Sequence, residues 1–164
     1  MLRRCLVLVL LLPLPALAAP PACTAPAHHQ FDFWIGKWKV TETKTGKAAG
    51  ASLIELLYGG CVLRENWTEP GFAGGSLNLF SDVDHQWHQT WTDSAGTWRE
   101  FRGGLQDGKM VLVWKHPSIK LPGQTIQERM IFTPGRDGSV RQYSDQSADG
   151  VHWKERYDYT YRHG

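Results

Sequence analysis

Apolar and polar residues alternate along most of the chain that follows residue 36, with the spacing of two that is typical of a β-strand with one buried face. Residues 151–162 show this best, because Tyr157, Tyr159 and Tyr161 occupy odd positions and every even position is polar. Residues 28–36 are rich in aromatic side chains and are expected to form a single helical turn. No later stretch keeps a helical period, so the pattern predicts an all-β fold.

Turn residues divide the alternating region into nine or ten short strands. Asp107–Gly108 is the strongest hairpin signal, because Asp-Gly readily adopts the backbone of a two-residue turn. Residues 69–75 contain three glycines and are expected to form a flexible connection or a lip of the barrel. The expected strands cover residues 37–43, 51–58, 61–68, 76–80, 86–92, 97–103, 109–115, 124–132, 139–144 and 151–162.

A meander of this many strands leaves two unpaired edges unless it closes on itself. We therefore predict an antiparallel up-and-down β-barrel of about nine or ten strands, which follows the short N-terminal helical turn. A barrel of this strand number can enclose a cavity for a small ligand. A two-sheet sandwich is the alternative.

The first residues have the pattern of a secretory signal peptide. Arg3 and Arg4 supply its positive start, residues 5–12 are apolar, and Ala16-Leu17-Ala18 matches the small residues of a cleavage site. The apolar run is shorter than the roughly 20 residues that span a membrane. We predict a signal peptide over 1–18, a Pro/Ala-rich arm over 19–30 and one barrel domain over 31–164, with a retained anchor and a lipid-modified Cys23 as alternatives.

Composition and net charge indicate which classes of binding partner the chain is suited to. The chain has 164 residues, of which 41% are hydrophobic and eight are Trp, so it can build a core. Its formal charge of +2 comes from Arg3 and Arg4 within the expected signal peptide. The remaining chain is neutral, which gives no electrostatic case for binding nucleic acid or for stable association with an anionic membrane.

Two cysteines remain once the signal peptide, which contains Cys5, is removed. An even pair in an exported protein predicts a disulfide between Cys23 and Cys61. This bond would hold the Pro/Ala-rich arm against the barrel. Two separate buried thiols are the alternative.

The sequence resembles two groups of proteins. Gly36-x-Trp38 after a short turn is similar to the entry of lipocalins and other calycin barrels, in which the Trp closes one end. A longer pattern resembles the secreted bacterial family of domain of unknown function 1579. This resemblance implies a calycin-like barrel in the periplasm or outside the cell, with no established activity and no catalytic residues. The pattern comprises Gly60-Cys61, Glu65-Asn66-Trp67, Gly75-Ser76-Leu77-Asn78, Trp87-His88-Gln89-Thr90-Trp91-Thr92-Asp93, Arg141-Gln142 and Ser147-Ala148-Asp149-Gly150 with Trp153.

Polar and aromatic residues share one face on consecutive expected strands. If this face lines the interior, its carboxylate, amide and indole groups form a site of the kind that holds a small, partly apolar ligand. A structural hydrogen-bond network, or exposure of some members to solvent, is the alternative. The candidates are Glu65, Trp67, Asn78, Gln89 and Trp91, with Arg129 and Gln142 as a cation and an amide from later strands.

Enzyme, metal and haem signatures are weak. The chain has no G-x-S-x-G elbow and no phosphate-binding glycine loop, so an enzyme would have to use Glu65 or Asp93 as acid or base. A third hypothesis is an interaction module with a filled core that uses residues 71–75. His85 and His88 lack a third ligand, and His163 lies beyond the last strand, so no metal and no cofactor is predicted.

Overall fold

A computed structural model describes residues 23–164 of the chain. The expected signal peptide, residues 1–18, and the first part of the Pro/Ala arm lie outside the described residues. Ten strands follow two short 3₁₀ turns, and a third turn, η3 (Tyr58–Gly60), links two of them. The strands are β1 (Gly36–Glu42), β2 (Ala48–Leu57), β3 (Val62–Glu69), β4 (Phe72–Ser81), β5 (Gln86–Asp93), β6 (Trp98–Gln106), β7 (Lys109–Pro117), β8 (Thr125–Pro134), β9 (Val140–Ser147) and β10 (Lys154–His163).

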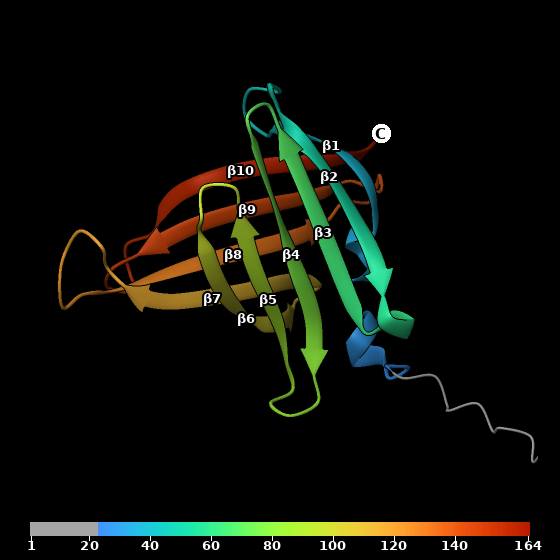
Figure 1. Cartoon of the computed structure of the whole chain (residues 1–164), viewed down its shortest axis with the longest axis horizontal. Coiled ribbons are helices and arrows are strands. Elements are labelled where there is room, and N and C mark those ends of the chain that lie inside the picture. The colour runs from blue at the N-terminus through green and yellow to red at the C-terminus, as the bar shows by residue number, and fades with distance from the viewer. Residues whose placement is uncertain (1–22) are drawn as a thin grey trace, which may run out of the picture.

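The strands close into an antiparallel up-and-down barrel (Figure 1). Each strand pairs with the next one along the chain, and β1 pairs with β10, from Trp38 opposite His163 to Glu42 opposite Tyr159. Closure leaves no strand without two neighbours, which removes the unpaired edges that a meander would expose. The predicted barrel is therefore confirmed, and the sandwich is wrong.

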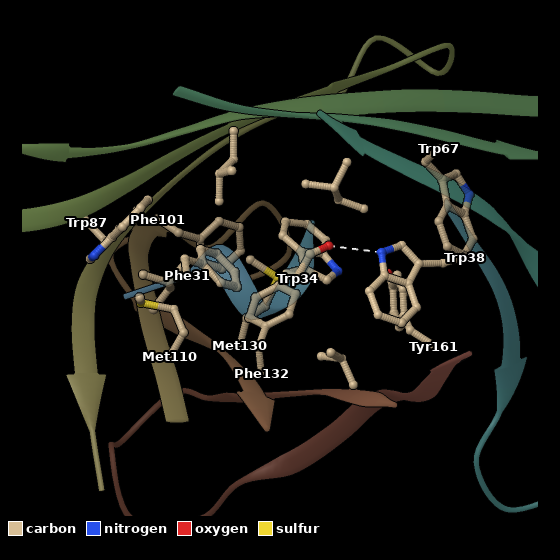
Figure 2. Close-up of a cluster of buried hydrophobic side chains, with 14 of the residues drawn as sticks. Phe31, Trp34, Trp38, Trp67, Trp87, Phe101, Met110, Met130, Phe132 and Tyr161 are labelled. Atoms are coloured by element: carbon tan, nitrogen blue, oxygen red, sulfur yellow. Dashed lines mark hydrogen bonds between the residues drawn. The ribbon is translucent and has the colours of Figure 1, made fainter. Parts of the chain in front are cut away.

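One end of the barrel is filled by the segment that precedes β1. The predicted single helical turn is in fact two 3₁₀ turns, η1 (Pro26–His29) and η2 (Asp32–Trp34). Phe31 and Trp34 are fully buried between the barrel walls at this end. Figure 2 shows both rings among the other side chains of the core. Trp38 on β1 donates a hydrogen bond from its indole to the backbone oxygen of Trp34, at 2.9 Å. These contacts attach the segment to the first strand.

A disulfide joins the N-terminal arm to the barrel, as the cysteine count predicted. Cys23 bonds to Cys61, with an S–S distance of 2.08 Å. Cys61 immediately precedes β3, so the bond fixes the start of the described chain beside the filled end. Within residues 23–164, no helix has the length and apolar character needed to cross a membrane.

The flexible connection expected over 69–75 is wrong, and the alternative, a lip of the barrel, is what the β3–β4 turn forms. Only Pro70 and Gly71 form the turn, and β4 already begins at Phe72. Gly75 pairs with Asn66, and a Cβ atom on Gly75 would lie 2.5 Å from the backbone oxygen of Glu65. The glycines therefore allow two strands to approach closely, which the sequence pattern does not distinguish from flexibility.

The last strand begins later than its alternation predicts. β10 starts at Lys154, and its register against β9 shifts between Glu155 and Tyr157. This irregularity interrupts the alternation of side chains along β10. Tyr157 and Tyr161 face the interior, whereas Glu155, also at an odd position, is exposed and forms an ion pair with Lys44 at 2.7 Å. A bulge of this kind re-aims the side chains on either side of it.

Candidate functional site

The end of the barrel opposite the N-terminal segment contains a cavity of about 180 Å³. This volume is slightly larger than the roughly 150 Å³ that holds one benzene molecule. The N-terminal segment packs against Trp87 and Phe132, whereas the cavity lies toward the β3–β4 and β5–β6 turns. The residues that line it are Glu65, Trp67, Glu69, Phe72, Gln89, Trp91, Asp93, Arg99, Phe101, Met130, Gln142, Tyr157, Tyr159 and Tyr161.

Glu65 lies at the inner part of this cavity and is almost fully buried. Alternation along β3 directs Leu63, Glu65 and Trp67 into the barrel. The hydroxyl of Ser76 donates to one carboxylate oxygen at 2.9 Å, and the hydroxyl of Ser52 donates to the other at 3.1 Å. Burial raises the pKa of Glu65 to about 7, because these two hydrogen bonds only partly offset the loss of water.

Two amide side chains extend this network along the barrel wall. Asn78 donates to the hydroxyl of Ser76 at 2.9 Å, and Gln89 donates to Asn78 at 2.7 Å. Gln89 lines the cavity, whereas Asn78 is fully buried behind it. The network therefore brings together Glu65, Asn78 and Gln89 of the predicted set, and Asn78 positions Gln89 and Ser76.

Aromatic rings form much of the remaining wall. Tyr157 and Tyr159 stack with ring centroids 4.9 Å apart, and Tyr159 stacks in turn with Trp67 at 5.9 Å. Burial raises the pKa of Tyr157 to about 12, so its hydroxyl stays protonated and neutral at ordinary pH. The wall therefore combines apolar ring surface with hydroxyl groups that do not ionise.

Gln142 joins two of these tyrosines. The hydroxyl of Tyr161 donates to its carbonyl oxygen at 2.6 Å, and its amide lies 3.3 Å from the hydroxyl of Tyr157. Burial also raises the pKa of Tyr161 well above its ordinary value. Gln142 thus faces the lumen, where the sequence analysis placed it.

Asp93 has a structural role at the mouth of the cavity. It accepts a hydrogen bond from the indole of Trp91 at 2.9 Å, and from the backbone amides of Ala95 and Thr97 at 3.0 Å each. Burial alone would raise the pKa of Asp93, but these hydrogen bonds outweigh it and hold the pKa below its usual range. An ionised carboxylate that already accepts three hydrogen bonds orients Trp91 and closes the β5–β6 turn, and it is a poor general base.

Arg129 lies outside the lumen, contrary to the sequence analysis. Met130 and Phe132 face inward from β8. Successive side chains of a strand point to opposite faces, so Arg129 points outward. Arg129 forms a two-pronged ion pair with Asp145, at 2.6 and 3.0 Å, and its guanidinium lies 4.1 Å from the ring of Trp153. It is a structural residue of the outer wall.

The cation that does reach the cavity is Arg99, which the sequence analysis missed. Arg99 lies on β6 opposite Trp91 and shares the inward parity of the buried Phe101, two positions later. The shared parity with Phe101 was the available signal. The cavity therefore has one guanidinium near its mouth, but no member of the predicted set supplies it.

The histidines singled out in the sequence do not come together. His88 pairs with Asp84 at 2.9 Å, and His85 lies in the β4–β5 turn. Over residues 23–164, no group of three His, Cys, Asp or Glu side chains has a geometry suited to a metal ion. His163 stacks on Trp38 with centroids 4.0 Å apart, at the end of the barrel away from the cavity.

No protein-family model matches this chain, and no curated protein matches its sequence. The functional proposal therefore depends on the residues of the lumen and on their geometry.

Proposed function

We propose that this protein is an exported, calycin-like barrel, related to the secreted bacterial family of domain of unknown function 1579, that binds a small and partly apolar ligand in its lumen. The observation that carries the proposal is the cavity of about 180 Å³, in which aromatic rings surround a few polar groups. Apolar walls with a small number of placed polar groups are typical of small-molecule sites. Glu65, Gln89 and Gln142 would contact the polar part of the ligand.

Export is part of the same proposal. The Cys23–Cys61 disulfide supports an oxidising compartment, the periplasm or the cell exterior, because such bonds rarely persist in the cytosol. The pattern of residues 1–18 supplies the signal for this route. The partner is a small molecule, with no nucleic acid and no stable insertion into a membrane after the signal is removed.

Native mass spectrometry of the mature protein, purified from its own secretion compartment, tests the proposal. We expect a reproducible mass above that of the chain less the two hydrogens lost in the disulfide. The double variant Trp91→Ala/Glu65→Gln should lose this excess mass without unfolding. The matched control Trp98→Ala/Glu55→Gln changes the same residue types at exposed positions and should retain it. An excess mass that persists in the first variant contradicts the lumen site.

A second candidate function is an enzyme on the same barrel. The observation that favours it is the pKa of Glu65, about 7, which suits a general base at neutral pH. Asp93, the other carboxylate considered, is already occupied by its hydrogen bonds. A bell-shaped dependence of rate on pH that disappears in Glu65→Gln would distinguish catalysis from binding. The cavity disfavours the third hypothesis, a module with a filled core.

A further inference from the structure

Within the part of the chain that the structure describes, Glu65 differs from the other buried carboxylates in having no cationic partner. Each of the others forms an ion pair with an arginine. Among residues 23–164, Glu65 has only the hydroxyls of Ser52 and Ser76 as partners. A buried charge is costly unless it is paired. The paired carboxylates are Glu128 with Arg156, Asp145 with Arg129 and Asp158 with Arg141.

The unpaired carboxylate faces the cavity, so a ligand can supply the missing charge. An ionised carboxylate has about four lone-pair positions, and the two serine hydroxyls use two of them. The remaining positions can accept hydrogen bonds from an ammonium group. No side chain of the described residues fills this role, although the barrel elsewhere pairs each buried carboxylate with an arginine.

The aromatic wall suits the same ligand. Trp67, Trp91 and Tyr159 line the cavity together with Glu65. Aromatic rings attract cations through their negative faces, most strongly where water is excluded. The rings can also bury the apolar part of a small organic amine, which a volume of about 180 Å³ accommodates as one ring with a short chain.

We propose that the lumen binds a small organic amine in its cationic form, with the ammonium group paired to Glu65 and the apolar part among the aromatic rings. This inference rests on the proposed lumen-binding function and names the class of its ligand. The charges of the cavity agree with it, because the lining contributed by residues 23–164 has three carboxylates, Glu65, Glu69 and Asp93, and one guanidinium, Arg99. This balance favours entry of a cation over entry of an anion.

We also expect Glu65 to release its proton when a cation binds beside it. Glu65 holds its proton up to about pH 7 in the free protein, and a bound ammonium group favours the ionised carboxylate. The affinity for the amine should therefore rise with pH through this range. The other titratable and charged groups that line the cavity around Glu65 come from β3, β5, β6 and β10, and they are Glu69, Asp93, Arg99, Tyr157, Tyr159 and Tyr161. Burial raises the pKa of the three tyrosines, and hydrogen bonds hold the pKa of Asp93 below its usual range, so these four groups do not titrate between pH 5.5 and 8.

Isothermal titration of the mature protein with three probes of similar size tests the inference. The probes are 2-phenylethylamine, 2-phenylethanol and phenylacetate, which are cationic, neutral and anionic at pH 8. We expect the amine to bind at least about tenfold more tightly than the alcohol at pH 8, and the anion to bind most weakly. Between pH 8 and pH 5.5 the amine should lose at least about tenfold in affinity, because Glu65 becomes protonated while the probe stays charged.

Variants separate the charge of Glu65 from the shape of the cavity. Glu65→Gln keeps the size of the side chain, and it should weaken the amine at least about 30-fold while changing the affinity for the alcohol less than threefold. Glu55→Gln, on the outer surface of β2, is the matched control and should change neither affinity. Titration at pH 6.5 in buffers of different ionisation enthalpy should also show release of most of one proton with the amine and none with the alcohol.

The outcomes distinguish this inference from the proposed function. If the alcohol or phenylacetate binds as well as the amine, or if Glu65→Gln leaves amine binding unchanged, the amine assignment is wrong although the lumen still binds a ligand. If affinity for the amine falls as pH rises, Glu65 acts as a neutral donor and the assignment is likewise wrong. If none of the three probes binds at millimolar concentration, the amine assignment is contradicted, and the lumen function is contradicted as well only if native mass spectrometry shows no excess mass.

Discussion

The indole of Trp91 on β5 lies directly against the backbone of Gly74 on β4, two positions before Ser76, which is the cross-strand partner of Trp91. A Cβ atom on Gly74 would be 2.5 Å from Cζ2 of Trp91 and 2.9 Å from the backbone oxygen of Thr92. Contacts this short force something to move, and the backbone atom cannot rotate away. The absence of a side chain at position 74 therefore lets Trp91 lie flat against the wall, beside the cavity.

We expect Gly74→Ala to displace Trp91 and to lower stability by about 1–3 kcal/mol, the usual cost of inserting one carbon into a packed region. The displaced ring should also weaken binding of the apolar probe in the lumen. Gly104→Ala is the matched control, because no atom lies within 4 Å of the added carbon. Urea denaturation of both variants, with titration of 2-phenylethanol, measures the two effects. Equal behaviour of the two variants would contradict the close contact.

Ionisation of Glu65 should destabilise the fold as pH rises. The ordinary pKa of 4.5 applies to the unfolded chain, whereas burial raises the pKa of the folded protein to about 7. Between these values the unfolded chain has released its proton and the folded protein still holds it, so rising pH favours unfolding. The group should therefore lower the free energy of unfolding by about 2–3 kcal/mol between pH 5 and pH 8.

Comparison of Glu65→Gln with the wild type isolates this contribution. The variant should lose less stability than the wild type over the same pH range, because glutamine does not titrate. Glu55→Gln provides the control, since Glu55 is exposed and pairs with Arg64 at 2.7 Å on the outer surface. Guanidinium denaturation at several pH values makes the measurement. Parallel curves for the wild type and Glu65→Gln would show that the carboxyl titrates normally.

The strand pattern predicted much of the lumen, because strict alternation decides which side chains share a face. Glu65 and Trp67 on β3, with Gln89 and Trp91 on β5, all point inward as their parity required. Arg129 is the exception, because its charge suggests a role in the lumen that its position in β8 excludes. Met130 and Phe132 occupy the even positions of β8 and face the interior, so the odd position of Arg129 faces outward.

Other features depend on contacts between distant parts of the chain. The aromatic residues of 28–36 predicted a turn, but not that Phe31 would lie 4.9 Å from Phe132 inside the barrel. The glycines before Ser76 looked like a flexible connection, although Gly74 and Gly75 are strand residues that allow close approach. Neither arrangement is encoded in local periodicity, since each is decided by a side chain or backbone far along the sequence.

The disulfide should contribute substantially to stability. Cys23 and Cys61 are separated by 38 residues, and closing a loop of that length in the unfolded chain corresponds to about 4 kcal/mol in the chain-entropy treatment. We expect Cys23→Ser/Cys61→Ser in the mature chain to lower the denaturation midpoint accordingly. Reductant should lower the midpoint of the wild type to that of the double variant and leave the variant unchanged. An unchanged midpoint under full reduction would show that the arm is held by packing alone.

Arg129 should matter for stability and leave the lumen unaffected. Asp145 is buried, and about a third of the Arg129 side chain is exposed. Arg129→Met leaves the carboxylate without its partner, which we expect to cost about 3 kcal/mol, the lower end of the range for a broken buried pair. Asp145→Asn added to this variant should recover part of the loss, because it removes the unpaired charge.

Arg162→Met is the control for the loss of an arginine from an ion pair. Arg162 pairs with Asp137 at 2.8 Å, and both side chains are more than half exposed, so its removal should cost less than about 1 kcal/mol. Thermal denaturation measures the stabilities, and titration with 2-phenylethylamine measures the lumen. Arg129→Met should keep the amine affinity of the wild type, because its guanidinium lies on the outer wall against Trp153. A loss of amine affinity without a loss of stability would instead show that Arg129 contacts the ligand.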